Sequence, residues 1–115
     1  LISANACGCK IQDAVEAKAI QSLFGSNVSN VPISANKSNI GESYGTSGAA
    51  QIISAVMSVN TGIIPQIINH KENDPDFNLN LVLERPLKKE IRYAMINNMD
   101  YDGNNACLVI SIFNK

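Results

Sequence analysis

The sequence contains no tryptophan, one histidine and three cysteines among its 115 residues, so it has few of the side chains that usually hold metal ions. It also lacks an excess of charge of one sign, because nine Lys and Arg stand against ten Asp and Glu, for a formal net charge of −1. That balance excludes the basic surface typical of nucleic-acid binding proteins. No stretch reaches the roughly 18 to 20 uninterrupted apolar residues that span a bilayer, which excludes a membrane helix and predicts a soluble chain.

Apolar residues are nevertheless plentiful in this sequence. They make up 45% of it, against 17% charged residues, a composition outside the range of disordered chains. A chain of this length suits one domain at most and buries only about two thirds of its unfolded surface. We therefore expect one folded unit with little tolerance for a missing element.

The first residue and the cysteines bear on the cellular location of the protein. The sequence begins at Leu1 with no basic, apolar leader, so neither a secretion signal nor a translational start is visible and we expect further sequence upstream. Cys7, Cys9 and Cys107 are an odd number of cysteines. They predict free thiols in a reducing cytoplasm rather than a disulfide framework.

The pattern of apolar residues predicts an α/β unit in the order strand, helix, strand, helix, strand, strand. The first helix is expected to begin at Asp13, whose spacing to Glu16 fits a capping box, and to end at Gly25. The second helix, residues 47–61, is apolar or small on nearly every side, which predicts a helix covered all round. The other expected elements are strands at 1–6, 31–34 and 81–83, loops through Gly45 and at 70–80, and a terminal hairpin of strands 91–97 and 106–113.

Metal binding is the first chemistry that these residues suggest. Cys7 and Cys9 lie two residues apart, so their thiols share one face of an extended chain. A structural zinc site needs four ligands, whereas this chain offers three cysteines and a distant His70. Residues 98–103 resemble the start of a calcium loop, but Val109 stands where a bidentate glutamate is required. We therefore expect no metal site, and small buried side chains at Cys7 and Cys9.

Phosphate binding and triad catalysis are equally poorly supported. The glycine-rich segment 41–48 lacks both the Gly-Lys-Ser/Thr sequence and the GxGxxG spacing of phosphate-binding loops. His70 lies beside Lys71 and Glu72 in a polar segment, which favours a solvated surface histidine over a member of a catalytic triad. The residues alone thus predict no cofactor and no catalytic set.

Several short blocks of sequence follow one another in a specific order. Residues 5–9 read Asn-Ala-Cys-Gly-Cys and are followed by Asp13 and Glu16. The later blocks are Val-Pro-Ile-Ser at 31–34, Lys-Ser at 37–38, Gly-Glu at 41–42 before a small-residue helix, Gly-Ile-Ile-Pro at 62–65, an Asn-to-Asp-Pro loop at 69–75 and Asn-Ala-Cys-Leu-Val-Ile at 105–110. Over nearly all 115 residues they resemble the C-terminal part of β-ketoacyl synthases of the thiolase fold. The resemblance implies an α/β fold with a mixed sheet and a buried central helix.

The departures from the family pattern concern its catalytic residues. By resemblance, active members use a cysteine nucleophile, located upstream of this region, and two histidines that assist decarboxylation of a malonyl thioester and stabilise the resulting charge. Asn5 stands at the first histidine position and Glu42 at the second, so neither neutral imidazole is available. An ionised Glu42 would also repel the malonyl carboxylate.

Two further family features are altered. Lys37 matches the lysine of the family, but Gln51 replaces the glutamate that usually pairs with it. The Gly-Phe-Gly-Gly gate loop of the family corresponds here to Asp100, Tyr101, Asp102 and Gly103, followed by Asn104. Side chains thus stand at positions where the glycines of the family permit special backbone angles. We therefore predict no catalytic residue here, but a vestigial site at Asn5, Lys37, Glu42 and Gln51 with a degenerate gate loop at 100–104.

Loss of catalytic residues with retention of the fold is similar to the chain length factors of type II polyketide synthases. The resemblance then implies a heterodimer with an active ketosynthase, whose interface encloses the polyketide tunnel. An acyl carrier protein would deliver the malonyl and polyketide thioesters. This subunit would shape the tunnel and help to set chain length, while its partner performs the chemistry.

The resemblance also implies an incomplete domain. A whole ketosynthase-like subunit is several times longer and has two pseudo-repeated halves, and this sequence begins in the second half, at a strand that normally lies mid-sheet. Alone it would expose the apolar helix at 47–61 and an unpaired strand edge. We expect residues 1–115 to be the C-terminal fragment of a split or cleaved subunit, cut just before Leu1 and bound to its N-terminal portion.

Three alternatives remain open. The chain could belong to a ketosynthase-like acyltransferase, such as a 3-oxoacyl-[acyl carrier protein] synthase, that stays active through an upstream cysteine and uses Asn5, Lys37 or Glu42 in altered roles. It could come from a non-elongating ketosynthase domain of a modular assembly line, or from an unrelated α/β protein. A cysteine at the upstream nucleophile position would favour the acyltransferases. Any other residue at that position would favour the chain length factor.

Overall fold

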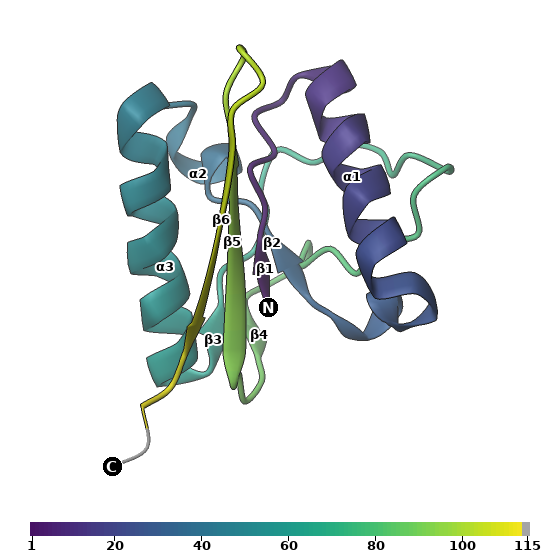
Figure 1. Ribbon diagram of the computed structural model, residues 1–115. Helices are drawn as coiled ribbons and strands as arrows, with labels where there is room; N and C mark the ends of the chain where they lie inside the picture. Colours follow the sequence, from purple (N-terminus) through teal and green to yellow (C-terminus); the bar gives the residue numbers. More distant parts are fainter. Residues whose placement is uncertain (114–115) are drawn as a thin grey trace.

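A four-stranded sheet forms the centre of the computed structural model, which describes residues 1–113 (Figure 1). Its strands are β1 (Ile2–Ser3), β2 (Ile33–Ser34), β5 (Tyr93–Met99) and β6 (Asn105–Ser111), in the order β2-β1-β5-β6. β1 runs parallel to both of its neighbours, whereas β6 returns antiparallel to β5 as a hairpin. The predicted mixed sheet is confirmed, and β1 lies in its interior.

The two long helices, α1 (Lys10–Phe24) and α3 (Ser47–Thr61), cover opposite faces of this sheet (Figure 1). On the α1 face, Ile20 packs with Ile2 and Ile33; on the α3 face, Ala55 packs with Ile96. The alternation of side chains along the strands separates the two cores. The remaining elements are the 3-10 helices η1 (Gly25–Asn30) and η2 (Tyr44–Thr46), the short helix α2 (Lys37–Ile40), and an antiparallel pair of β3 (Ile63–Ile64) with β4 (Leu87–Lys88).

The predicted start of the first helix is wrong. The Asp13 N–H already donates to the Cys9 carbonyl at 2.8 Å, so α1 begins at Lys10 and Asp13 lies within its first turn. No side-chain hydrogen bond caps this helix, and the buried Glu16 carboxylate accepts from the Asn5 N–H, just after β1. Asp13 accepts from the Gly8 N–H at 3.1 Å. The Asp-to-Glu spacing that suggests a capping box therefore reflects two separate contacts to the bend after β1.

The structure differs from the prediction in three other places. The expected edge strand at 81–83 is reduced to one parallel bridge between Leu81 and Ile33, and the pair of β3 with β4 was not predicted. The segment expected as a loop before α3 contains α2 and η2. These elements are two to four residues long, too short for hydrophobic periodicity to reveal.

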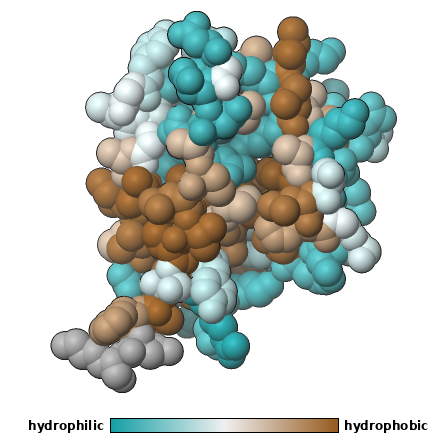
Figure 2. All heavy atoms as spheres, viewed as in Figure 1, coloured by the Kyte–Doolittle hydropathy of each residue, from teal (hydrophilic) through white to brown (hydrophobic). Residues whose placement is uncertain are grey.

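The second helix has the predicted bounds, but only one of its faces is covered within residues 1–113. Gln51, Ala55 and Val59 pack toward the sheet, whereas Ile53 and Met57 on the outward face are 66% and 56% exposed. Figure 2 shows apolar side chains gathered over α3 and the adjoining part of β6. An exposed patch of this kind is typical of a surface that another protein segment covers. Neither α3 nor any other helix within these residues is long and apolar enough to cross a bilayer.

Candidate functional site

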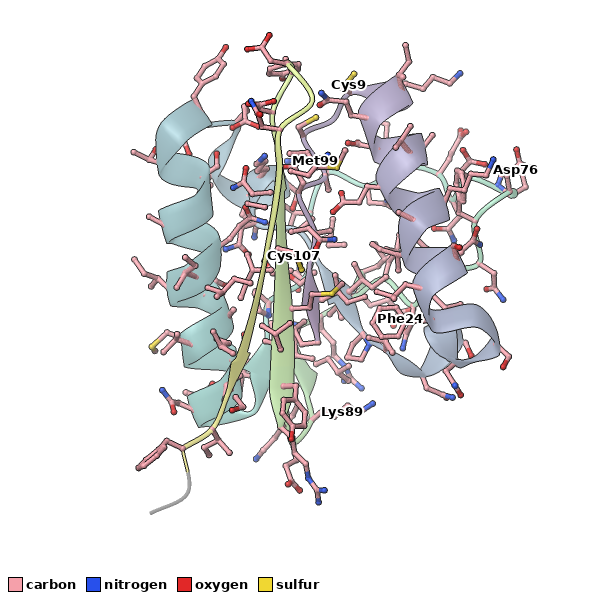
Figure 3. The ribbon with its side chains drawn as sticks, in the orientation of Figure 1. Cys9, Phe24, Asp76, Lys89, Met99 and Cys107 are labelled. Carbon is pink, nitrogen blue, oxygen red and sulfur yellow. The ribbon has the colours of Figure 1, made fainter. Side chains whose placement is uncertain are left out.

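The predicted site residues gather at one edge of the sheet. β1, β2 and β5 are parallel, so the segments that follow them emerge at the same edge: Asn5 after β1, Lys37 after β2 and the hairpin turn after β5. In Figure 3 the labelled side chains of Cys9, at the start of α1, and Met99, at the end of β5, lie at this edge. Open α/β sheets commonly place their binding sites at the carboxyl ends of parallel strands.

Lys37 is the centre of the site. It is 7% exposed, and its Nζ donates to Asn5 Oδ1 at 2.7 Å and lies 2.8 Å from Glu42 Oε2. Asn5 Oδ1 also accepts the Met99 N–H at 3.1 Å. The structure thus brings together three of the four predicted vestigial residues, Asn5, Lys37 and Glu42, in one hydrogen-bonded group.

Glu42 is held by three donors. Besides Lys37, the Ser47 hydroxyl donates to its Oε1 at 2.6 Å and the Tyr44 N–H at 2.8 Å. Burial alone would raise the pKa of Glu42, but the hydrogen bonds from Lys37, Ser47 and Tyr44 outweigh that effect and the pKa lies below its usual value. Glu42 is therefore ionised at neutral pH, with Lys37 opposing its charge. The repulsion of a malonyl carboxylate expected from Glu42 is accordingly weakened.

Gln51 does not share a contact with Lys37. It is fully buried, its Nε2 donates to the Ala4 and Asn97 carbonyls at 2.9 Å each, and its Oε1 accepts from Asn98 Nδ2 at 3.1 Å. These bonds fasten α3 to the sheet. The lysine keeps a carboxylate partner after all, which is supplied by Glu42 rather than by position 51.

Glu16 is a site residue whose role the sequence reasoning missed. Its Oε1 accepts from Asn5 N at 2.8 Å and from Asn97 Nδ2 at 3.2 Å, and its Oε2 accepts from Ala6 N at 2.9 Å. Ala6 has a positive φ of 36°, a conformation that favours glycine. The carboxylate on α1 thus holds the bend that positions Asn5. The only available signal was the position of Glu16 in the block after residues 5–9.

The predicted gate loop is a tight turn organised by Asp100. Asp100 Oδ1 accepts from the backbone N–H groups of Asp102 and Asn104 at 3.0 and 2.8 Å, and its Oδ2 accepts from Asn104 Nδ2 at 2.7 Å. The side-chain hydrogen bond from Asn104 is the main cause that lowers the pKa of Asp100. Within this turn only Gly103 has a positive φ, 92°, so Asp100, Tyr101 and Asp102 occupy positions that need no glycine.

The cysteines and the histidine lie outside this hydrogen-bonded group. Cys7 and Cys9 are partly exposed and Cys107 is exposed, so the prediction of small buried side chains at Cys7 and Cys9 is wrong. All three thiols are free, as predicted. His70 is exposed and pairs with Asn73 at 2.8 Å, which confirms a surface histidine. Within residues 1–113, no three His, Cys, Asp or Glu side chains form a group that could hold a metal ion.

A groove adjoins the site on the α1 face of the sheet. It has a volume of about 800 Å³ and lies between α1 and the segment 67–81, with Ile33 and Ala35 among the residues that line it. Glu16 and Lys37 also line this groove. The same two buried charged residues therefore border both the groove and the hydrogen-bonded group around Asn5.

Comparison with known proteins agrees with this arrangement. Residues 1–71 match the family described as "Beta-ketoacyl synthase, C-terminal domain". Nodulation protein E of Rhizobium meliloti is 33% identical over 93% of this chain and 27% of its own length. The 3-oxoacyl-[acyl-carrier-protein] synthase 2 of Mycobacterium leprae is 31% identical over 97% of this chain and 26% of its own length. The chain thus spans about a quarter of the length of these curated relatives.

Two solved structures are also similar to this chain. The structure described as "The ishigamide ketosynthase/chain length factor" aligns with a TM-score of 0.92 and 34% identity, over 98% of this chain and 28% of that one. A type II polyketide ketosynthase bound to its acyl-carrier protein aligns with a TM-score of 0.93 over 97% of this chain and 28% of that one. Its 21% identity supports the fold alone. The thiolase-like α/β fold expected from the sequence is confirmed.

Proposed function

The chain belongs to the β-ketoacyl synthase family, and from this premise we propose that it is part of a non-catalytic chain length factor of a type II polyketide synthase. In this role it pairs with an active ketosynthase, helps to shape the tunnel for the growing polyketide and thereby helps to set its length. Asn5, Lys37, Glu42 and Gln51 are the remnant of the active site, and the turn at 100–104 is the degenerate gate loop. We expect such an assembly in the reducing cytoplasm, where Cys7, Cys9 and Cys107 stay free.

The observation that carries this proposal is the mutual engagement of Asn5, Lys37 and Glu42. General acid–base catalysis needs a group that can exchange a proton with the reacting atoms near neutral pH. Here the Asn5 amide does not titrate, and Glu42 is held ionised by its three donors. The single histidine, His70, lies exposed in the segment beyond Ile68. Within the described residues the site therefore offers no imidazole for decarboxylation.

The proposed partners follow from the uncovered surface and from the relatives. The outward face of α3, with Ile53 and Met57, fits the N-terminal portion of a ketosynthase-like subunit, joined to this chain or present as a separate polypeptide. The neighbour described as a ketosynthase/chain length factor supports an active ketosynthase as the second partner. An acyl carrier protein carrying malonyl or polyketide thioesters is the third. Native mass spectrometry followed by denaturing mass analysis identifies each of them.

Reconstitution tests the proposed role directly. The full-length subunit is combined with its ketosynthase, acyl carrier protein and labelled malonyl thioester, and the products are sized by chromatography and mass spectrometry. We expect all product to disappear when the nucleophilic cysteine of the ketosynthase is replaced by alanine, and Glu42→His in this subunit to restore none. Condensation that persists with the inactivated ketosynthase would contradict a non-catalytic role.

The main alternative is an acyltransferase that works through a cysteine outside this chain, for instance in a non-elongating ketosynthase domain. The specific observation in its favour is the buried Lys37 with a carboxylate partner, together with the 31% identity to a 3-oxoacyl-[acyl-carrier-protein] synthase 2. Incubation of the full-length protein with an acyl thioester separates the two functions. A covalent acyl adduct on this subunit supports the acyltransferase, and its absence supports the chain length factor.

A further inference from the structure

Two thiols lie in the bend that joins β1 to α1. Cys7 and Cys9 are both free and partly exposed, and Gly8 between them has a φ of 81°. The Cys9 backbone N–H donates a hydrogen bond to the Cys7 sulfur. Cα atoms two residues apart are separated by at most about 7 Å even in an extended chain, and a disulfide spans about 4.4 to 6.8 Å between Cα atoms. A disulfide between Cys7 and Cys9 therefore needs a rearrangement of this bend alone.

The Cys7 thiol is also a hydrogen-bond donor to the first turn of α1. Its Sγ donates to Gln12 Oε1 at 2.9 Å and to Asp13 Oδ1 at 3.7 Å. Burial raises the pKa of the Cys7 thiol above its usual value, and the hydrogen bond from the Cys9 N–H opposes that effect only in part. The Cys7 thiol therefore keeps its proton at neutral pH and remains a donor to Gln12.

Gln12 connects the Cys7 thiol to the turn at 100–104. The thiol faces Gln12 Oε1, and Gln12 Nε2 donates to the Asp100 carbonyl at 3.2 Å. Within residues 1–113, no other hydrogen bond joins this turn to a part of the chain outside the hairpin of β5 and β6. Charge on Cys7 is the main cause that raises the pKa of Tyr101, which shows that the thiol and the turn lie close together. Figure 3 likewise shows the labelled Cys9 at the end of the sheet where the hairpin turns.

We propose that Cys7 and Cys9 form a redox modification site, which a small-molecule disulfide oxidises to a protein disulfide, and that this oxidation releases the turn at 100–104 from Gln12. One protein thiolate attacks a sulfur of the small disulfide and expels the first small thiolate. The second protein thiolate attacks the resulting mixed disulfide and expels the other. The two protein thiols are thereby oxidised, and the small disulfide is reduced to two thiols, which take up the two protons. Oxidised Cys7 has no S–H group left to donate to Gln12.

The reduced pair is the resting state in a reducing compartment, and the disulfide forms when a small-molecule disulfide accumulates. The consequence extends to the candidate site, because Met99, which precedes the turn, donates to Asn5 Oδ1 at 3.1 Å. The proposal goes beyond the proposed function and is independent of it. Neither the thiol exchange nor the release of the turn requires a ketosynthase partner or an acyl thioester.

Peptide mapping tests the modification site. The full-length protein, purified with any bound partners, is incubated with glutathione disulfide, its remaining thiols are blocked, and it is digested with trypsin. Cleavage after Lys10 places Cys7 and Cys9 in one peptide and Cys107 in another. We expect the first peptide to lose the mass of two hydrogens and to regain it with dithiothreitol, while Cys107 gains a glutathionyl group. Glutathionyl groups on Cys7 and Cys9 without closure, or a first peptide that stays reduced while Cys107 reacts, would overturn the modification site.

Hydrogen–deuterium exchange, followed by mass spectrometry, tests the release of the turn. Exchange of the amides at 100–104 should become about fivefold faster in the oxidised wild-type protein, the range of one lost hydrogen bond, and should slow again with dithiothreitol. This comparison needs no variant to fold. Unchanged exchange in a fully oxidised protein would overturn the role of Gln12 in holding the turn, and would leave the modification site intact.

Three variants separate the contributions to this exchange. Cys7→Ala removes the donor without oxidation, so the reduced variant should already exchange as fast as the oxidised wild type. Gln12→Ala removes the connection to Asp100 and should exchange equally fast in both redox states. Cys107→Ala leaves Cys7 and Gln12 in place, so it is the matched control and should respond to oxidation like the wild type. A reduced Cys7→Ala variant that exchanges as slowly as the reduced wild type would overturn the role of the Cys7 thiol.

Discussion

Replacement of Glu16 by glutamine should destabilise the protein strongly, although it changes one atom. Glu16 is 5% exposed and its two oxygens accept three hydrogen bonds, from Asn5 N, Ala6 N and Asn97 Nδ2. In Glu16→Gln the better orientation keeps Oε1 as the acceptor for Asn5 and Asn97, and its new NH₂ then faces the Ala6 N–H. One charge-assisted bond is lost and the other two become neutral bonds, which are roughly half as strong.

The expected loss is about 2 to 4 kcal/mol of unfolding free energy, since a lost charge-assisted bond and an unsatisfied N–H each contribute about 1 to 3 kcal/mol. Urea titration of the full-length subunit in its complex, followed by circular dichroism, measures it. Glu90→Gln, whose side chain is 83% exposed, should stay within about 0.5 kcal/mol of wild type. A Glu16→Gln variant as stable as the Glu90→Gln control would refute the idea that this carboxylate holds the bend after β1.

Three further changes test neighbouring parts of the site. Ala6→Gly should stabilise the protein by up to about 1 kcal/mol because it relieves the φ of 36° at Ala6; a lower urea midpoint than wild type would show that the bend is not strained. Gly48→Ala would place a Cβ 2.9 Å from Asn98 Nδ2, so the amide end of Asn98 must shift and its bond to Gln51 is disturbed, at a cost of about 1 kcal/mol. Because alanine in place of a glycine within a helix gains about 0.5 to 1 kcal/mol, the two effects should nearly cancel, and a melting temperature well above that of wild type would contradict the close contact. Because the pKa of Glu42 is lowered in the folded state, its stabilising contribution is present above the unfolded pKa of about 4.3 and is lost as the pH falls through the lower folded value. Unfolding free energies between pH 7 and 3 should therefore fall less steeply in Glu42→Gln than in wild type, and identical profiles would show that Glu42 gains nothing from Lys37.

The sequence predicted the long elements well. Helix α3 and the hairpin of β5 and β6 have many apolar side chains at regular spacing, so each pattern is repeated several times within the element. The start of α1 was missed because the Cys9 carbonyl, rather than a polar side chain, receives the Asp13 N–H. Partial exposure of Cys7 and Cys9 could not be predicted either, because it depends on how the bend after β1 meets α1.

Some features of the candidate site could be predicted from the sequence and others could not. Resemblance to known blocks identified Asn5, Lys37 and Glu42 as members of one site, and the structure places them in direct contact. The pairing of Lys37 with Glu42 could not be predicted, because a contact between α2 and the segment after it depends on a sharp turn at Gly41, which has a φ of 79°. The resemblance identifies which residues gather at this site, whereas the partners of each donor require the three-dimensional arrangement.

The contacts of Lys37 explain why the altered residues at this site depend on one another. A buried lysine whose carboxylate partner is removed is destabilising by about 3 to 5 kcal/mol, because the remaining charge stays desolvated. Glu42 neutralises Lys37, and Asn5 Oδ1 supplies the second acceptor. Gln51 bonds to Ala4, Asn97 and Asn98 and takes no part in this pairing. A histidine at position 42 would leave Lys37 without a carboxylate partner. Asn5 and Glu42 are therefore linked through Lys37, and recovery of an imidazole at position 42 alone would cost stability before it could contribute to catalysis.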